Sequence, residues 1–157
     1  MENDKVIDVS NGEVVNETQV VAFKLRDEEY GVSILNVQEI KDLTDITRVP
    51  YAPDYIKGVI NLRGSVLPVI DLKRRIGLAD MPYTSSTRIV IMKIEEISIG
   101  MIVDAVTEVL TIGEDHIEPA KTISNSEINK YISGIGNIND RLVIMLNLDE
   151  IVDLPED

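Results

Sequence analysis

An internal repeat constrains the fold of this chain more than any other feature of its sequence. When residues 55–72 are aligned with residues 131–148, a shift of 76 positions, five residues are identical: Tyr55, Ile56, Gly58, Asn61 and Leu72 match Tyr131, Ile132, Gly134, Asn137 and Leu148. Apolar residues also match at Val59, Leu62, Val66 and Ile70, whereas Arg63 and Gly64 align with Asn139 and Asp140. We expect the shared residues to form the scaffold, and the unshared ones to be candidates for function.

The repeat extends upstream with a different spacing. At a shift of 69 positions, four residues recur: Gly31, Val37, Glu39 and Pro50 match Gly100, Val106, Glu108 and Pro119. Each half of the sequence therefore has a hairpin, a connector through proline and a pair of strands. This order predicts a duplication that produces two related barrels. Because a small incomplete sheet buries its apolar face poorly, we expect the two lobes to share a core.

Short runs rich in valine and isoleucine, bounded by turn-forming residues, predict an all-β fold. The predicted strands cover residues 20–25, 30–34, 58–62, 66–70, 88–94, 97–103 and 141–146. Hairpin turns are expected at residues 26–29 and 95–96, and short helices at residues 34–41, 71–76 and 148–152. Pro68 cannot donate a ladder hydrogen bond, so its strand should be an edge strand or carry a bulge. Gly64 accepts a positive φ, which favours a tight turn that projects Arg63.

Composition excludes several classes of function. The chain has no cysteine, so it can form neither disulfides nor thiolate metal sites. Its 28 acidic and 15 basic residues give a net charge of -13, which disfavours nucleic acids and anionic membranes as partners. No apolar run reaches the ~20 residues of a membrane helix, so we expect no membrane insertion. We expect a flexible tail over residues 1–18, one domain over residues 19–154 and a tail over residues 155–157.

The residues give no sign of catalytic chemistry. The single histidine, His116, lies in a polar connector without a partner nucleophile, and no nucleophile elbow, phosphate loop or calcium loop is present. Acidic residues are so numerous that no pair of carboxylates stands out. We therefore expect no enzymatic activity, no cofactor and no metal. Arg63, beside apolar residues at a turn, has the composition of a protein interface instead.

Several motifs together resemble the CheW-type coupling proteins of bacterial chemotaxis. They are IKGVINLRGSVLPVIDL, with EEYGVSILNVQEI upstream, IGMIVDAVTEVL, and YISGIGNINDRLVIMLNLDEIV near the end. The resemblance implies two five-stranded SH3-like β-barrels around a shared core, with a few short helices. It also implies a non-catalytic cytoplasmic adaptor, recruited to membrane-associated receptor arrays. Its implied partners are chemoreceptor cytoplasmic tips and the regulatory domain of the histidine kinase CheA, and we expect a monomer when the protein is alone.

The same resemblance implies a receptor-binding set of eight residues: Val37, Glu39, Ile40, Gly58, Asn61, Leu62, Arg63 and Gly64. The repeat qualifies three of these: Glu39, Gly58 and Asn61 recur as Glu108, Gly134 and Asn137, so they are also candidates for a role in the fold itself. Arg63 is consequently the strongest functional candidate. The sequence does not identify residues that bind the kinase.

Two alternative functions stay open at this point. One is a relative of the kinase regulatory domain or of the CheV type, in which such a domain is joined to a receiver. Since the sequence ends at Asp157, soon after the last repeat element, we expect neither. The other, from a different class, is a small metal-dependent enzyme that uses clustered carboxylates.

Overall fold

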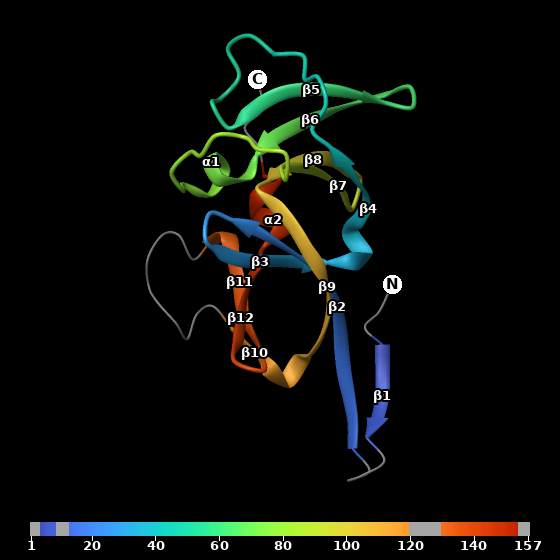
Figure 1. Cartoon of the computed structure of the whole chain (residues 1–157). Helices are drawn as coiled ribbons and strands as arrows, with labels where there is room; N and C mark the ends of the chain where they lie inside the picture. Colours follow the sequence, from blue (N-terminus) through green and yellow to red (C-terminus); the bar gives the residue numbers. More distant parts are fainter. Residues whose placement is uncertain (1–3, 9–12, 120–129, 154–157) are drawn as a thin grey trace.

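The computed structural model describes residues 4–8, 13–119 and 130–153. Two β-sheets form the molecule (Figure 1). Its strands are β1 (Asp4–Asp8), β2 (Glu13–Leu25), β3 (Glu28–Ser33), β4 (Val37–Asp42), β5 (Ile56–Leu62), β6 (Ser65–Asp71), β7 (Arg88–Ile94), β8 (Ile97–Val103), β9 (Ala105–Gly113), β10 (Ile117–Pro119), β11 (Ile132–Ile138) and β12 (Arg141–Leu146). Its helices are η1 (Ile34–Asn36), α1 (Leu72–Ile76), η2 (Glu114–His116) and α2 (Leu148–Ile151).

The two sheets are two SH3-like barrels, which confirms the predicted fold class. The five strands from the middle of the chain form one barrel in the order β4-β7-β8-β6-β5, which we call the middle barrel. Strands from both ends form the terminal barrel, in the order β1-β2-β3-β12-β11-β10 with β9 paired to β2. Five of its strands, β9, β2, β3, β12 and β11, correspond to the five of the middle barrel, and β1 and β10 are additional.

The two sequence repeats exchange parts between the barrels. Strand β12 of the second repeat pairs in parallel with β3 of the first, where Met145 lies opposite Gly31. Strand β6 of the first repeat pairs in parallel with β8 of the second, where Val69 lies opposite Gly100. These four residues are equivalent under the two repeat spacings. Each barrel therefore combines a hairpin from one half of the sequence with a strand pair from the other.

The barrels share the main hydrophobic core, as the sequence predicts. A single cluster of buried side chains joins Phe23 and Leu25 of the terminal barrel to Met92 and Met101 of the middle barrel. Ile151 of α2 is also fully buried in this cluster. Two smaller clusters lie within the individual barrels. Because the largest cluster belongs to both barrels, neither barrel can be removed without exposing the other one's apolar side chains.

Arg75 of α1 links the two copies of the repeat at this shared core. Its guanidinium carbon lies 4.8 Å from the ring centroid of Tyr55 and 5.3 Å from that of Tyr131, the two repeat-equivalent tyrosines. The same guanidinium donates hydrogen bonds to the carbonyl oxygens of Glu150, Ile151 and Asp153, at 2.9 to 3.0 Å. Arg75 therefore holds α1 against the end of α2.

Most predicted elements are confirmed. The seven predicted strands are present, and hairpin turns join β2 to β3 and β7 to β8 as expected. Helices α1 and α2 lie in the predicted positions, and the side chains of Asp71 and Asn147 cap their first turns. Pro68 lies beyond the pairing of β6 with β8, which begins at Val69, so its segment has only β5 as a neighbour. This agrees with the predicted edge position.

The predicted helix over residues 34–41 is wrong. Only η1 is helical there, and residues 37–42 form strand β4, which pairs with β7. The side chains of β4 alternate between half-buried and exposed, which is the period of a strand. Pairing with a long neighbouring strand outweighs the weak local preference for a helix.

At the amino-terminal end, β1 pairs with β2 in antiparallel register within the stretch expected to be a tail. The predicted bounds of the tail and the domain stay predictions, and residues 155–157 lie outside the described residues. In the described part of the chain, every helix is too short to span a membrane.

Candidate functional site

The turn between β5 and β6 has the tight two-residue form that the sequence predicts. Arg63 and Gly64 both have positive φ, 51° and 88°, as a type I′ hairpin turn requires. The side-chain oxygen of Asn61 accepts a hydrogen bond from the Gly64 amide at 3.0 Å. In the second repeat, Asn139 and Asp140 have φ values of 49° and 67°. Both copies thus make the same turn, and only the first carries an arginine on it.

Arg63 forms an ion pair with Glu39, which lies on β4. The Arg63 side chain remains 74% exposed, whereas that of Glu39 is 28% exposed. The family resemblance implies that both residues face the receptor, and the structure shows that they pair with each other. An exposed ion pair contributes about 0 to 1 kcal/mol, so a competing charge can replace one member at little cost.

All eight predicted site residues lie on β4 or on the β5–β6 hairpin. Ile40 is 43% exposed, and Val66, beyond the turn, is 68% exposed. Val37 and Leu62 are half-buried and pack against the core clusters. The two elements therefore offer exposed apolar side chains as well as the Arg63–Glu39 pair.

Gly58 has a structural role in the barrel. It is buried with φ of 149°, and a Cβ there would lie 2.1 Å from the carbonyl oxygen of Thr47. The residue that follows it, Val59, exchanges two backbone hydrogen bonds with Thr47, of 2.8 and 2.9 Å. At Gly134, a Cβ would lie 2.6 Å from the carbonyl oxygen of Glu118. Both glycines allow another segment of backbone to pass close by, because they have no side chain. A direct role of Gly58 in binding stays a prediction.

The terminal barrel has a related ion pair that the sequence analysis missed. Arg141, the first residue of β12, donates two hydrogen bonds of 2.6 Å to Glu29 and one of 2.5 Å to Glu108, the counterpart of Glu39. The Arg141 guanidinium lowers the pKa of the Glu29 carboxyl below its usual value. Arg141 is 38% exposed and has two carboxylate partners. The alignment of Glu108 with Glu39 in the repeat was the one sequence feature that pointed to this ion pair.

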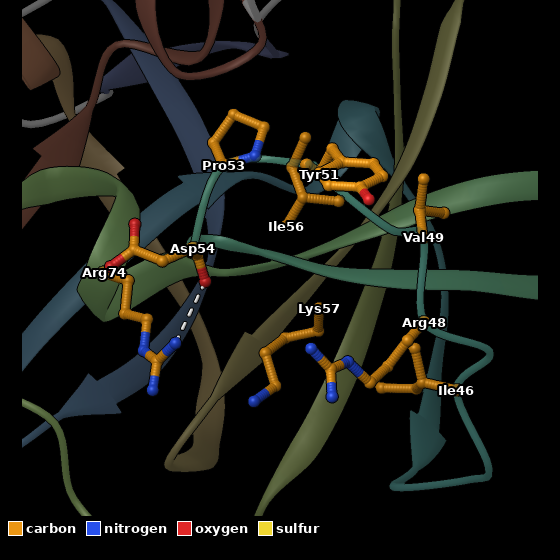
Figure 2. Close-up of a pocket in the computed structure, with 10 residues that line it drawn as sticks. Ile46, Arg48, Val49, Tyr51, Pro53, Asp54, Ile56, Lys57 and Arg74 are labelled. Atoms are coloured by element: carbon orange, nitrogen blue, oxygen red, sulfur yellow. Dashed lines mark hydrogen bonds between the residues drawn. The ribbon is translucent and has the colours of Figure 1, made fainter.

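A pocket of about 490 Å³ lies at the other end of β5, beneath the loop of residues 43–55 (Figure 2). It is lined by Ile46, Arg48, Val49, Tyr51, Ala52, Pro53, Asp54, Ile56, Lys57 and Arg74. None of the eight predicted receptor-binding residues lines it.

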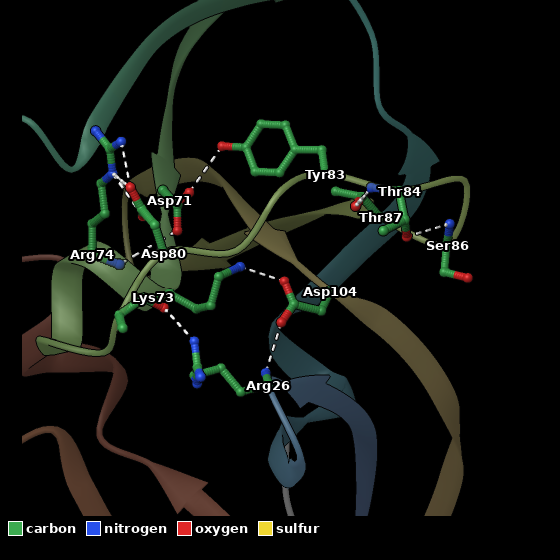
Figure 3. A network of polar contacts seen from close by, with 11 residues as sticks. Arg26, Asp71, Lys73, Arg74, Asp80, Tyr83, Thr84, Ser86, Thr87 and Asp104 are labelled. Atoms are coloured by element: carbon green, nitrogen blue, oxygen red, sulfur yellow. Dashed lines mark hydrogen bonds and ion pairs between the residues drawn. The ribbon is translucent and has the colours of Figure 1, made fainter.

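Buried polar groups form a structural network around α1, seen in Figure 3. Lys73 is fully buried and pairs with Asp104, which also accepts a hydrogen bond of 2.6 Å from the Arg26 amide in the β2–β3 turn. Asp71 accepts a hydrogen bond of 2.8 Å from the Tyr83 hydroxyl. Burial, together with this bond, raises the pKa of Tyr83 well above its usual value. Each of these charges has a partner within the fold.

The arrangement suits binding more than chemistry. Within residues 4–8, 13–119 and 130–153, no group of three or more acidic or histidine side chains could hold a metal ion. His116 is exposed, and its Nε2 lies 3.8 Å from the carboxylate of Asp115, which is also exposed. The groups that remain available are an exposed arginine, its carboxylate neighbour and exposed apolar side chains.

Comparison with known proteins gives a consistent result. The family model described as "CheW-like domain" matches residues 19–156. Chemotaxis protein CheW of Klebsiella aerogenes is 33% identical over 145 residues, which cover 92% of this chain and 87% of that protein. Chemotaxis protein CheW of Helicobacter pylori is 38% identical, covering 85% of this chain and 81% of that one. The crystal structure of the scaffolding protein TtCheW from Thermoanaerobacter tengcongensis superimposes with a TM-score of 0.82 at 36% identity, covering 89% of this chain and 95% of that one.

Proposed function

Because the chain belongs to the CheW-like family of chemotaxis scaffold proteins, we propose that it is a non-catalytic adaptor that couples chemoreceptors to the histidine kinase CheA. It binds receptor cytoplasmic tips on one surface and the kinase regulatory domain on another. The protein works in the cytoplasm and is recruited to membrane-associated receptor arrays. Signalling then depends on population shifts in the assembly, without covalent change to this chain.

The receptor-facing surface consists of β4 and the β5–β6 hairpin. One observation carries this assignment: the rigid type I′ turn projects Arg63 with most of its side chain exposed, next to Glu39. A receptor tip is a helical hairpin, and exposed Ile40 and Val66 supply apolar area against it. Charges on the helices then compete for Arg63 and Glu39, which fixes the register of binding.

The kinase-facing surface is separate from this one. The kinase regulatory domain has the same SH3-like architecture in this family, so its contact resembles the packing of two such adaptors. Exposed apolar residues outside β4 and the β5–β6 hairpin, such as Val109 and Leu142 of the terminal barrel, are available for such a contact.

A binding experiment with both partners tests the proposal. Immobilised receptor tip and kinase regulatory domain should each capture the folded protein. The Arg63→Ala variant should lose receptor capture and keep kinase capture. Lys24→Ala is the matched control, because Lys24 is an exposed cation on β2 of the terminal barrel, in a different sheet from β4 and the β5–β6 hairpin. Failure of the folded protein to bind either partner would refute the adaptor function.

A further inference from the structure

Two cations that form no ion pair in the described part of the chain line the pocket under residues 43–55. In the described part of the chain, neither Arg48 nor Lys57 forms an ion pair, although acidic residues greatly outnumber basic ones. Arg74, also at this pocket, is held by Asp80 through hydrogen bonds of 2.7 to 3.1 Å. Figure 2 shows the side chains of Arg48 and Lys57 on the same side of the pocket. The Lys57 ammonium lies 5.5 Å from the centroid of the Tyr83 ring. Neither cation is paired with a carboxylate of the described residues, so both charges are available to an anionic ligand.

Unusual backbone conformations occur at two residues that line this pocket, Lys57 and Tyr51. Lys57 lies at a β-bulge, where the pairing of β5 with β6 shifts between Ile56 and Gly58. A bulge redirects the side chain of the extra residue. Tyr51 has a φ of 65° and a fully exposed side chain. A bulky residue in this region is strained, and such strain is often found at functional positions.

The second repeat has no equivalent cations, although it keeps the bulge. The positions that correspond to Lys57 and Arg74 are Ser133 and Glu150. The pairing of β11 with β12 shifts between Ile132 and Gly134, as it does in the first repeat. The bulge is therefore part of the barrel scaffold, and the positive charges are specific to one copy.

The depression is elongated and partly apolar. A second pocket, of about 210 Å³, shares Lys57 and Arg74 with the first and extends toward Met81 and Tyr83. Exposed Val49, Tyr51 and Met81 lie along the two pockets. Aromatic residues, methionine and arginine are enriched at protein interfaces. An extended peptide fits this shape and composition better than a compact anion.

We propose that this depression binds an acidic segment of a protein partner. An apolar side chain of the segment packs against Ile56 and Tyr51, and its flanking carboxylates pair with Arg48 and Lys57. This site is distinct from the receptor-facing turn, because the six residues of strand from Lys57 to Arg63 span about 20 Å. It can thus be occupied while Arg63 is engaged.

Nuclear magnetic resonance titration of the full chain tests the proposal. The probes are three acetylated, amidated pentapeptides that carry two acidic residues on each side of a central leucine, phenylalanine or tyrosine. At least one should shift the backbone amides of Arg48, Tyr51 and Lys57, with affinity that falls as salt rises. Matched peptides with asparagine and glutamine in place of the acids should not shift them.

Substitution of the two cations identifies the contact. The double variant Arg48→Ala, Lys57→Ala should weaken binding about fivefold or more, whereas Lys24→Ala should leave it unchanged. The cation residues are exposed or half-buried, so we expect the double variant to fold, as its amide spectrum can verify.

Four results would overturn the proposal. They are absence of binding by all three acidic peptides, equal binding of the uncharged peptides, and tighter binding of inorganic phosphate or AMP at the same amides. The fourth is self-association that depends on Arg48 and Lys57, since it would make a second copy of this chain the occupant.

Discussion

The two hairpins β5–β6 and β11–β12 share one scaffold and differ in the charges they carry. Both contain a bulge at the same position, a glycine that admits a close backbone crossing, and a turn with two positive φ values. In the second hairpin, Arg141 is held by two carboxylates within the terminal barrel. In the first, Arg63 stands on the turn itself with one carboxylate neighbour. The duplicated backbone is thus conserved within the molecule, while one arginine is committed to the fold and the other remains accessible.

The largest expected effect comes from the shared scaffold. Gly58→Ala and Gly134→Ala should each reduce the free energy of unfolding by about 3 kcal/mol, because the new Cβ overlaps a backbone carbonyl oxygen. Gly58→Ala should cost more, since its φ is also unfavourable for alanine. Urea denaturation measures both values. Gly64→Ala is a useful comparison, because a Cβ there has no neighbour within 4 Å and only the φ is unfavourable. Unchanged stability of Gly58→Ala, with loss of partner binding, would show that Gly58 serves recognition.

The next effect concerns the contact between the two repeats. Arg75→Ala should lower the free energy of unfolding by about 2 kcal/mol, because it removes two tyrosine contacts and three hydrogen bonds to carbonyl oxygens. Thermal unfolding of Tyr55→Leu and Tyr131→Leu compares how much each repeat contributes to the contact with Arg75. If the two repeats contribute alike, these variants should lose similar stability. A large loss for one and none for the other would show that Arg75 depends on a single copy.

The ion pair of the terminal barrel should make a smaller, pH-dependent contribution. Arg141→Ala should lower the free energy of unfolding by about 1 kcal/mol at neutral pH. Because Arg141 depresses the pKa of Glu29 below its ordinary 4.5, this stabilisation is complete above that value and is lost as pH falls through the lower pKa of the folded state. Denaturation at pH 7 and at pH 3 should show the difference between the two proteins shrinking with acid. A difference that grows with acid would contradict this role of Glu29.

The smallest stability effect is expected at Arg63. Its exposed pair with Glu39 should contribute less than about 0.5 kcal/mol, so Arg63→Ala should unfold at nearly the same urea concentration as the parent. Comparison with Arg141→Ala in the same experiment tests whether the two arginines differ as proposed. Equal destabilisation by both substitutions would assign Arg63 to the scaffold.

Local sequence patterns were sufficient to predict much of the fold. Runs of valine and isoleucine located the strands β7 and β8. Asp71 caps the start of α1 and Gly77 its end, as is usual for a capped helix. The strand β4 was missed because apolar and polar residues do not alternate regularly in its sequence, VQEIKD. Its conformation depends on pairing with β7. The exchange of hairpins between repeats was also missed. It depends on long-range parallel pairing at Gly31 and Gly100, which no local pattern encodes.

The candidate site was predictable in part. The repeat singled out Arg63 because the second copy lacks it, and the turn was evident from Gly64. The ion pair of Arg63 with Glu39 was not predicted, since it joins residues that lie on different elements and meet only when the barrel closes. The role of Arg48 and Lys57 was not evident either, because whether a cation has a carboxylate partner is a property of the folded chain.

Receptor binding by Arg63 variants is the decisive test of the role that we assign to the Arg63 turn. Titration calorimetry with a receptor tip should compare the parent protein, Arg63→Ala and Arg63→Glu, alongside the control Lys24→Ala. We expect both Arg63 substitutions to weaken receptor binding at least tenfold while the variants unfold at the parent's urea concentration, and we expect Lys24→Ala to change neither quantity. Parent-like receptor affinity in a folded Arg63→Glu variant would contradict this role.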